Sequence, residues 1–162
     1  MDTYLPQFVY GATDGIVTTF AIVAGAAGAN LSSLTILAIG IASVLADGYS
    51  MGISSYLSKL SEPESSPIHE ASALNIGIAT FLSFVIMGII PILPFMLPTT
   101  ILTFQQEKII SLILALIAFF TVGFIKGIYR KDKYPSQTGL QTFVIGLSAA
   151  IVAYLTGYYV GG

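Results

Sequence analysis

The sequence of 162 residues has no cysteine, no tryptophan and a single histidine. The lack of cysteine excludes disulfide bonds, thiolate metal sites and thiol redox chemistry. Charged residues are scarce as well: they make up 9% of the chain, against about a quarter in soluble domains. The formal net charge of −2 is too small to indicate nucleic acid or an anionic surface as a partner.

Long apolar runs take the place of the missing charges. Hydrophobic residues form 55% of the chain, and the mean hydropathy is +0.87. Several runs approach the ~20 residues that a helix needs to cross the hydrocarbon layer. The first run has no Lys or Arg before it and contains Pro6 and Asp14, so we expect a retained helix rather than a signal peptide. The sequence therefore predicts an all-α, polytopic membrane protein.

Five segments qualify as membrane-spanning helices. Asn30-Leu-Ser-Ser is a short turn between the first two, with Ser32 or Ser33 placed to cap the second helix. Near the end of the third segment, prolines remove backbone donors and should kink or unwind it, at positions Pro91, Pro94 and Pro98. We predict one transmembrane domain over residues 1–162, with helices at about 6–29, 33–58, 70–97, 106–128 and 136–159.

The positions of the basic residues predict the orientation of these helices. If the N-terminus is cytoplasmic, only Lys108 of the six Lys and Arg residues falls on the outer side. The other five fall at the cytoplasmic connections, namely Lys59, Lys126, Arg130, Lys131 and Lys133. Lys126 is expected to extend its ammonium group to the membrane surface. We therefore predict a cytoplasmic N-terminus and a C-terminus on the opposite side.

Two carboxylates, Asp14 and Asp47, lie inside the first two apolar runs. An ionisable group at that depth costs roughly 2.5–3.5 kcal/mol, and such groups usually face a water-filled path or a partner. The first two helices are antiparallel, so residues equally far from their turn share a depth. Asp14 and Met51 form one such pair, and Thr18 and Asp47 form another. Within each helix the two residues are four positions apart and share a face.

If these two faces meet, carboxylate, hydroxyl and thioether ligands form a ladder on the cytoplasmic side of the membrane midplane. Oxygen ligands alone favour hard cations such as Mg²⁺ or Ca²⁺, whereas a thioether shifts the preference towards softer transition metals. A mixed Asp, Met and Thr site without Cys fits weakly held Fe²⁺ or Mn²⁺ better than tightly bound Zn²⁺. Protonation of the carboxylates would compete with metal, which offers a physical route to metal/proton exchange.

Structural interpretations of the same residues stay open. A membrane Asp can serve only as an interhelical hydrogen-bond partner, and a Met in an apolar helix is usually core filler, as we expect for Met87 and Met96. The connection between the second and third helices contains four residues that could bind metal, namely Glu62, Glu64, His69 and Glu70. A solvated linker is the favoured interpretation of this segment. Closely spaced glycines favour contact between the first two helices and a dimer built on them, at Gly11, Gly15, Gly25, Gly28, Gly48 and Gly52.

Two stretches resemble a known family: DGIVTTFAIVAGAAGA, which begins at Asp14, and ADGYSMGISSYLS, which begins at Ala46. Together with the last helix, from Gly139 onwards, they resemble the vacuolar iron transporter (VIT) family. The resemblance implies five helices per protomer and a homodimer, with a path between the copies lined by the first two helices. It also implies transport of Fe²⁺, and often Mn²⁺, out of the cytosol in exchange for protons. In that scheme Asp14 and Met51 are the intramembrane metal ligands.

The chain departs from this family pattern at two places. Well-studied plant members carry a Glu-rich cytoplasmic metal-binding domain between the second and third helices. Here only the short link from Lys59 to His69 joins them. Asp47 stands where many members have a small residue, and its charge can alter ion choice or coupling.

The sequence thus predicts a homodimeric transporter exporting Fe²⁺ or Mn²⁺ against protons, with Asp14, Met51, Asp47 and Thr18 as metal-site residues. We expect no enzymatic activity and no bound cofactor, since the metal is the cargo, and we place this multi-pass protein in the cell membrane. The alternative is a non-transporting structural or accessory subunit, in which Asp14 and Asp47 only hold helices together. An organic-cation transporter is disfavoured because the chain has no Trp to build a cation–π site.

Overall fold

The computed structural model describes residues 5–62, 67–98 and 100–161, with the backbone alone between 67 and 71. Its elements are α1 (Leu5–Gly28), α2 (Ser33–Leu60), α3 (Pro67–Ile89), the 3-10 segment η1 (Ile90–Met96), α4 (Phe104–Tyr129) and α5 (Pro135–Gly161). Five helices are long and apolar enough to cross a membrane, which confirms the predicted all-helical, five-span architecture. In hydrocarbon each backbone polar group needs a partner within the chain, and helices supply it.

The helix ends carry the side chains that such ends require. Ser32 caps α2 by accepting a hydrogen bond from the backbone N–H of Thr35, at 3.2 Å, which confirms the cap predicted at this turn. α4 begins with a capping box between Thr103 and Gln106. After α1, Asn30 adopts a φ of 53°, a left-handed conformation that Asn tolerates better than most residues.

The third predicted span is interrupted by its prolines, as expected. α3 ends at Ile89, and the chain continues as the tighter segment η1, which contains Pro91 and Pro94. A proline lacks the backbone N–H and clashes with the preceding turn, so the α-helix stops there. The freed carbonyl of Pro91 accepts a hydrogen bond from the Ser111 hydroxyl of α4 at 2.5 Å. This bond ties η1 to α4.

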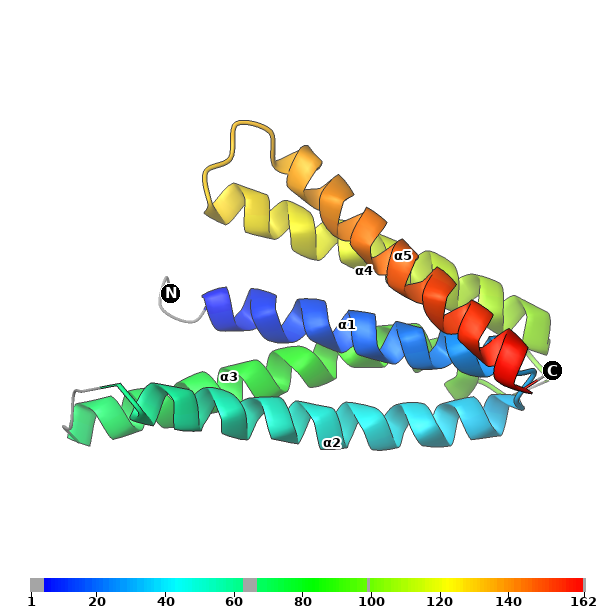
Figure 1. Ribbon diagram of the computed structural model, residues 1–162, viewed down its shortest axis with the longest axis horizontal. Coiled ribbons are helices and arrows are strands. Elements are labelled where there is room, and N and C mark those ends of the chain that lie inside the picture. The colour runs from blue at the N-terminus through cyan, green and yellow to red at the C-terminus, as the bar shows by residue number, and fades with distance from the viewer. Residues whose placement is uncertain (1–4, 63–66, 99, 162) are drawn as a thin grey trace.

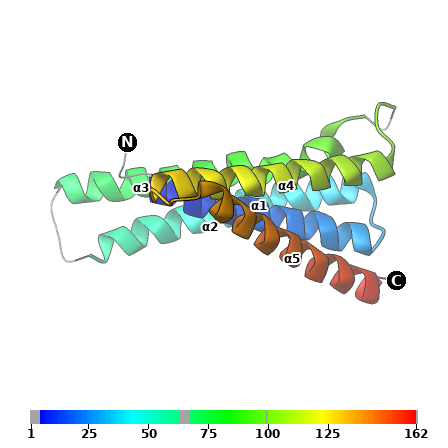
Figure 2. The ribbon, with the colours of Figure 1, turned by 90° about the horizontal axis from the view of Figure 1, so that it is seen from above.

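α1 lies at the centre of the bundle and contacts each of the other long helices (Figure 1). α2 and α3 pack on one side of it, and α4 and α5 lie on the other. α5 leaves the connection with α4, crosses that helix and ends beside the last turns of α1 (Figure 2). It is the least buried of the five spans.

Two apolar clusters hold the bundle together. The first joins α1, α4 and α5, and in it Phe20 and Phe119 pack edge to face with ring centroids 6.2 Å apart. The second joins α1, α2 and η1 through Val23, Ile36 and Ile92. Both clusters include α1, which explains its central place.

The six glycines that predicted a contact between α1 and α2 approach α3 and α5 instead. A Cβ on Gly15 would lie 2.4 Å from the carbonyl oxygen of Phe84, and one on Gly52 would lie 3.0 Å from that of Gly77. A Cβ on Gly28 would lie 2.3 Å from a carbonyl oxygen of α5. The prediction that these glycines support an α1–α2 contact is therefore wrong. A small-residue motif permits close helix packing but does not specify the partner helix.

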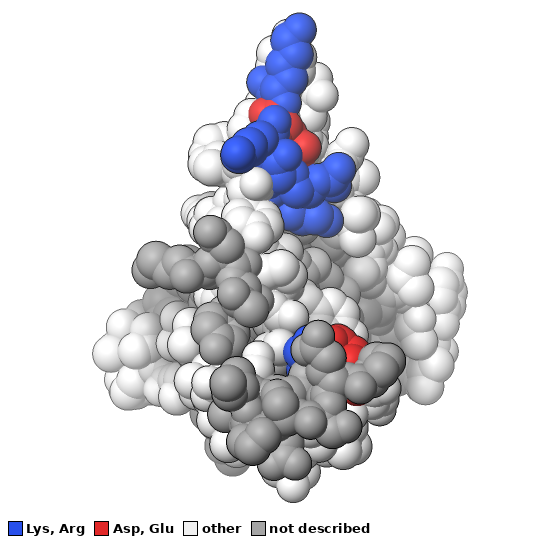
Figure 3. Space-filling model, turned by 90° about the vertical axis from the view of Figure 1, so that its left-hand side faces the viewer, with Lys and Arg blue, Asp and Glu red and all other residues white. Residues whose placement is uncertain are grey.

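Five of the six Lys and Arg residues lie at the end of the bundle where α2 and α4 finish, here named the basic end. Figure 3 looks at this end and shows basic side chains gathered over the α4–α5 connection. Arg130 pairs there with Asp132 at 3.6 Å, and Lys59 pairs with Glu62. Lys108 lies at the opposite end. That the basic end faces the cytoplasm stays a prediction.

Candidate metal site

Asp14 lies within α1, and its side chain is exposed. It lines a groove of about 500 Å³ between the first half of α1 and the last turns of α4. Lys126 and Arg130 border the same groove. A carboxylate on a membrane-spanning helix is costly in contact with lipid. We therefore expect water or a second protein surface to cover this face.

Asp47 on α2 is half-buried and accepts a hydrogen bond from the hydroxyl of Ser43, one turn earlier. Asp47 on α2 and Asp14 on α1 are both carboxylates inside membrane-spanning helices. A divalent cation bound between two such carboxylates would neutralise their charge, and so would a proton on either of them.

Met51 lines a different hollow, of about 550 Å³, at the basic end. Hydroxyls and charges form much of its wall, from Ser50, Ser54, Ser55, Ser58, Lys59 and Glu62. Pro6 and Tyr10 border both this hollow and the Asp14 groove, so the two hollows are adjacent. Thr18 is half-buried, one turn after Asp14.

A single protomer does not gather the four predicted site residues in one cavity. α1 and α2 each pack more extensively on α3 than on each other, so their ligand-bearing faces are not pressed together. Asp14 and Met51, expected at one depth, consequently line separate hollows. Within the described part of the chain, no three His, Asp or Glu side chains cluster as a metal-binding group. The predicted residues Glu64, His69 and Glu70 fall outside the described side chains.

Two basic residues near Asp14 were not assigned to the site from the sequence. Lys126 was expected at the membrane surface and Arg130 in a loop, yet both border the Asp14 groove. Their spacing of four places them on one face of the end of α4. That spacing was visible in the sequence, but the helix that this face meets was not.

An acidic residue that sequence reasoning left out is Glu107. It lies in the first turn of α4, is fully buried and accepts a hydrogen bond from the hydroxyl of Ser33. The available signal was a carboxylate at the start of an apolar run, directly after the Thr103–Gln106 capping box. Its burial depends on α2 and η1, which no local pattern reveals.

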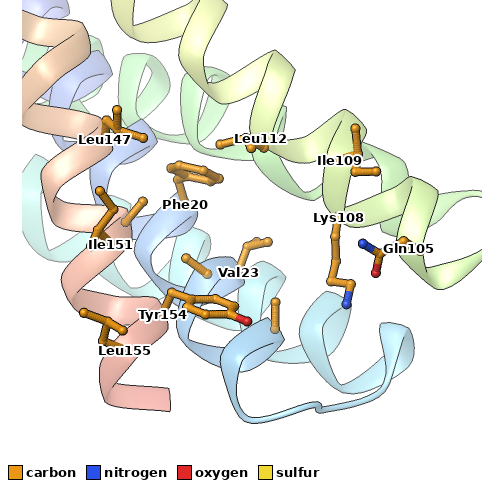
Figure 4. Close-up of a pocket in the computed structure, with 13 residues that line it drawn as sticks. Phe20, Val23, Gln105, Lys108, Ile109, Leu112, Leu147, Ile151, Tyr154 and Leu155 are labelled. Carbon is orange, nitrogen blue, oxygen red and sulfur yellow. The ribbon is translucent and has the colours of Figure 1, made fainter. Parts of the chain in front are cut away.

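A third hollow, of about 410 Å³, lies between α1, α4 and α5 and is apolar. Phe20, Leu112, Leu147 and Ile151 point into it, and Lys108 is the charged residue at its margin (Figure 4). It contains none of the four predicted site residues. We therefore do not include it in the candidate metal site.

These features define a multi-pass membrane protein with carboxylates inside its first two spans and a polar hollow at its basic end. The chain belongs to the VIT family, whose model matches residues 5–67 and 62–158. The family resemblance carried by the first two helices is thereby confirmed.

Relatives of known name agree with this assignment. The chain is 27% identical to a vacuolar iron transporter of Centaurea cyanus, over 91% of this chain and 84% of that protein. It is 26% identical to vacuolar iron transporter 1 of Arabidopsis thaliana, over 91% and 82%. A vacuolar iron transporter of Toxoplasma gondii is 48% identical, over 38% of this chain and 20% of that protein.

The comparison also locates where this chain is shorter. The alignment with the Centaurea protein runs over 211 positions, more than the 162 residues of this chain, so that protein has residues absent here. The two family matches meet at residues 62–67, in the connection between α2 and α3. This is the connection in which the family resemblance implied a missing cytoplasmic domain.

Proposed function

We propose that this protein is a divalent transition-metal transporter that moves Fe²⁺, Mn²⁺ or both out of the cytoplasm in exchange for protons. The observation that carries the proposal is the pair of carboxylates inside the first two spans, Asp14 and Asp47. Either a cation or protons can neutralise this pair, which is the chemical requirement for exchanging one for the other. The names of the relatives support iron as a cargo.

The path is proposed to lie between two copies joined through α1 and α2. One protomer leaves Asp14 exposed and does not enclose its ligands. A two-fold axis beside this face would cover Asp14 and double the number of carboxylates around one channel. Met51 would then add thioether sulfur and Thr18 a hydroxyl, a mixture that suits Fe²⁺ or Mn²⁺.

Metal is proposed to enter through the polar hollow that Met51 lines. Lys126 and Arg130 border the Asp14 groove, and their positive charges repel an approaching cation. The hollow that Met51 lines instead offers hydroxyls, and its Lys59 ammonium group is paired with the carboxylate of Glu62. With the basic end in the cytoplasm, this route leads from the cytoplasm to the paired acids. We propose the cell membrane as its location.

The test is metal flux into proteoliposomes under an imposed pH gradient. We expect Fe²⁺ uptake that depends on the gradient in the wild type and is abolished in Asp14→Asn, which keeps the side-chain shape but not the charge. Asp132→Asn is the matched control: this carboxylate lies in the α4–α5 connection and is expected to be dispensable for flux.

The alternative function, a non-transporting accessory subunit, predicts a different result. In that case a folded wild-type protein gives no flux of Fe²⁺ or Mn²⁺, and Asp14→Asn leaves its assembly unchanged. If flux persists in Asp14→Asn, the protein is still a transporter, but Asp14 is not part of its metal path.

A further inference from the structure

The apolar hollow of about 410 Å³ between α1, α4 and α5 becomes polar at one end. Lys108 and Gln105 line it from the first turns of α4, and Tyr154 lines it from the last turns of α5. Figure 4 shows the Lys108 ammonium group and the Tyr154 hydroxyl on the same side of the hollow. These helix ends belong to the end of the bundle opposite to the basic end, so the polar part of the hollow lies near that membrane surface.

The rest of the hollow is built of hydrocarbon. Leu112 lies one turn further along α4 than Lys108. Leu147 lies two turns before Tyr154 on α5, and Phe20 contributes its ring from α1 (Figure 4). Water finds too few polar partners in an apolar cavity to occupy it. The side chain of Leu112 is 38% exposed, so a hydrocarbon chain from the surrounding membrane can reach the hollow and fill it.

Lys108 gives the polar end of the hollow its positive charge. Of the six Lys and Arg residues, it alone lies at this end of the bundle. Its ammonium group lies 4.5 Å from the centre of the Phe104 ring, and it forms no ion pair within the described part of the chain. None of the described residues that line the hollow is acidic, and the neighbouring Glu107 accepts a hydrogen bond from Ser33 of α2 instead. A lysine near a membrane surface extends its charge to the phosphates of lipid headgroups.

We propose that the hollow binds an anionic phospholipid of the leaflet opposite to the basic end, with its phosphate at Lys108 and one acyl chain between α4 and α5. The amide of Gln105 and the hydroxyl of Tyr154 donate hydrogen bonds to the other headgroup oxygens. A soluble phosphate compound would match only the polar end of the hollow, and an apolar protein face would match only the rest. The hollow contains none of the candidate metal residues, so this inference does not depend on the proposed transport.

The chain contains no Trp, so one introduced Trp reports on the lipid beside it without background. Leu155→Trp places an indole on the wall of the hollow, and Val152→Trp places one nearby on α5, outside the lining residues. Each variant is reconstituted in phosphatidylcholine vesicles with increasing amounts of phosphatidylglycerol whose acyl chains carry bromine, a quencher of indole fluorescence. At Leu155→Trp we expect about a fivefold preference for the anionic lipid, the effect of one lysine near a membrane surface. Quenching at Val152→Trp should follow the share of this lipid in the membrane.

Two lysine variants in the Leu155→Trp protein assign the preference to the proposed phosphate contact. Lys108→Gln should lower the preference to that of the Val152→Trp reporter. Lys133→Gln is the matched control, because its ammonium group also lies near an aromatic ring, 5.4 Å from the centre of that of Tyr134, but at the basic end. It should leave the preference unchanged. A preference that survives Lys108→Gln, or that is equal at the two reporters, overturns the proposal.

The same measurement recognises a second copy of the chain as the occupant. If neither brominated phosphatidylcholine nor brominated phosphatidylglycerol quenches Leu155→Trp in the folded protein, a second copy covers the hollow and the proposal is wrong. Ile109→Trp, on the α4 wall of the hollow, replaces Leu155→Trp if that variant does not fold. The fluorescence readout uses no metal. It therefore decides on the lipid site even if the protein moves no Fe²⁺ or Mn²⁺, a result that would refute only the proposed function.

Discussion

Asp14 lies on an exposed face of α1, in a groove that Lys126 and Arg130 also border. Asp47 lies on α2, outside the residues that line this groove. In the proposed transporter a divalent cation would be held at the carboxylates of Asp14 and Asp47, and the basic residues of the groove would disfavour its approach from that side.

Met51 tests whether sulfur contributes to ion choice. We expect Met51→Leu, which keeps the apolar bulk but removes the sulfur, to lower Fe²⁺ flux by roughly 10–100-fold, the scale of loss when a metal site loses a supporting group. Mn²⁺ flux should fall less, because the harder ion depends less on a thioether. The measurement is initial flux of both ions into the same proteoliposomes.

If Met51→Leu lowers the Fe²⁺ flux and the Mn²⁺ flux by the same factor, Met51 is not a metal ligand. Met87→Leu is the matched control, since Met87 is a half-buried methionine that packs against the core cluster of α1, α4 and α5. It should leave the ratio of the two fluxes unchanged.

At the scale of helices, α1 and α5 come closest where both carry glycine. A Cβ on Gly157 would lie 1.9 Å from the carbonyl oxygen of Gly25, whereas a Cβ on Gly25 would lie 3.3 Å from that of Ala153. Backbone cannot move aside as a side-chain tip can. The contact between these helices therefore tolerates a methyl group on Gly25 of α1 but not on Gly157 of α5.

The pair of variants Gly157→Ala and Gly25→Ala measures this asymmetry. Gly157→Ala should destabilise the protein by about 1–3 kcal/mol, the usual cost of overpacking. Gly25→Ala should be close to neutral, because the gain in helix propensity, about 1 kcal/mol, offsets the tighter contact. Thermal unfolding in detergent checks both, and equal melting temperatures would show that α5 is not held by this contact.

Much of the element structure could be predicted because the bilayer restricts it. The five spans follow from run length and hydropathy, and the break in the third follows from Pro91 and Pro94. The partner of each helix face could not be predicted in this way. Gly15 and Gly52 have the spacing of a contact motif, but only the packed bundle shows that both meet α3.

At the scale of the whole molecule, the sequence did not show which other side chains surround Asp14 and Asp47. Symmetry about the first turn gave the depth of Asp14 and Met51. The direction in which each side chain points depends on α3, on which both helices pack more extensively than on each other. Glu107 escaped notice for the same reason, since its burial is a property of three elements together. The depth of a residue in the membrane can be predicted from the two helices of one hairpin. The direction in which its side chain points depends on how the whole bundle packs.

The proposed dimer can be tested directly because the chain has no cysteine. Single cysteines at Ser50 or Ser54, on the polar face of α2, should form disulfide-linked dimers under mild oxidation. Ile145→Cys is the control, at similar depth on α5 and 61% exposed. Cross-linking at Ile145 without any at Ser50 or Ser54 would place the interface on α5 and contradict a path lined by α1 and α2.

The oblique course of α5 makes the shape of this protein depend on bilayer thickness. With 27 residues at 1.5 Å each, α5 is about 40 Å long, and the hydrocarbon layer is about 30 Å thick. A helix longer than the layer is accommodated by tilting, so a thinner membrane requires α5 to lean further. Because α5 is anchored to α1 at one end and joined to α4 at the other, added tilt widens the wedge between α4 and α5 (Figure 2). The length of the lipid chains thereby affects how far α4 and α5 are spread apart.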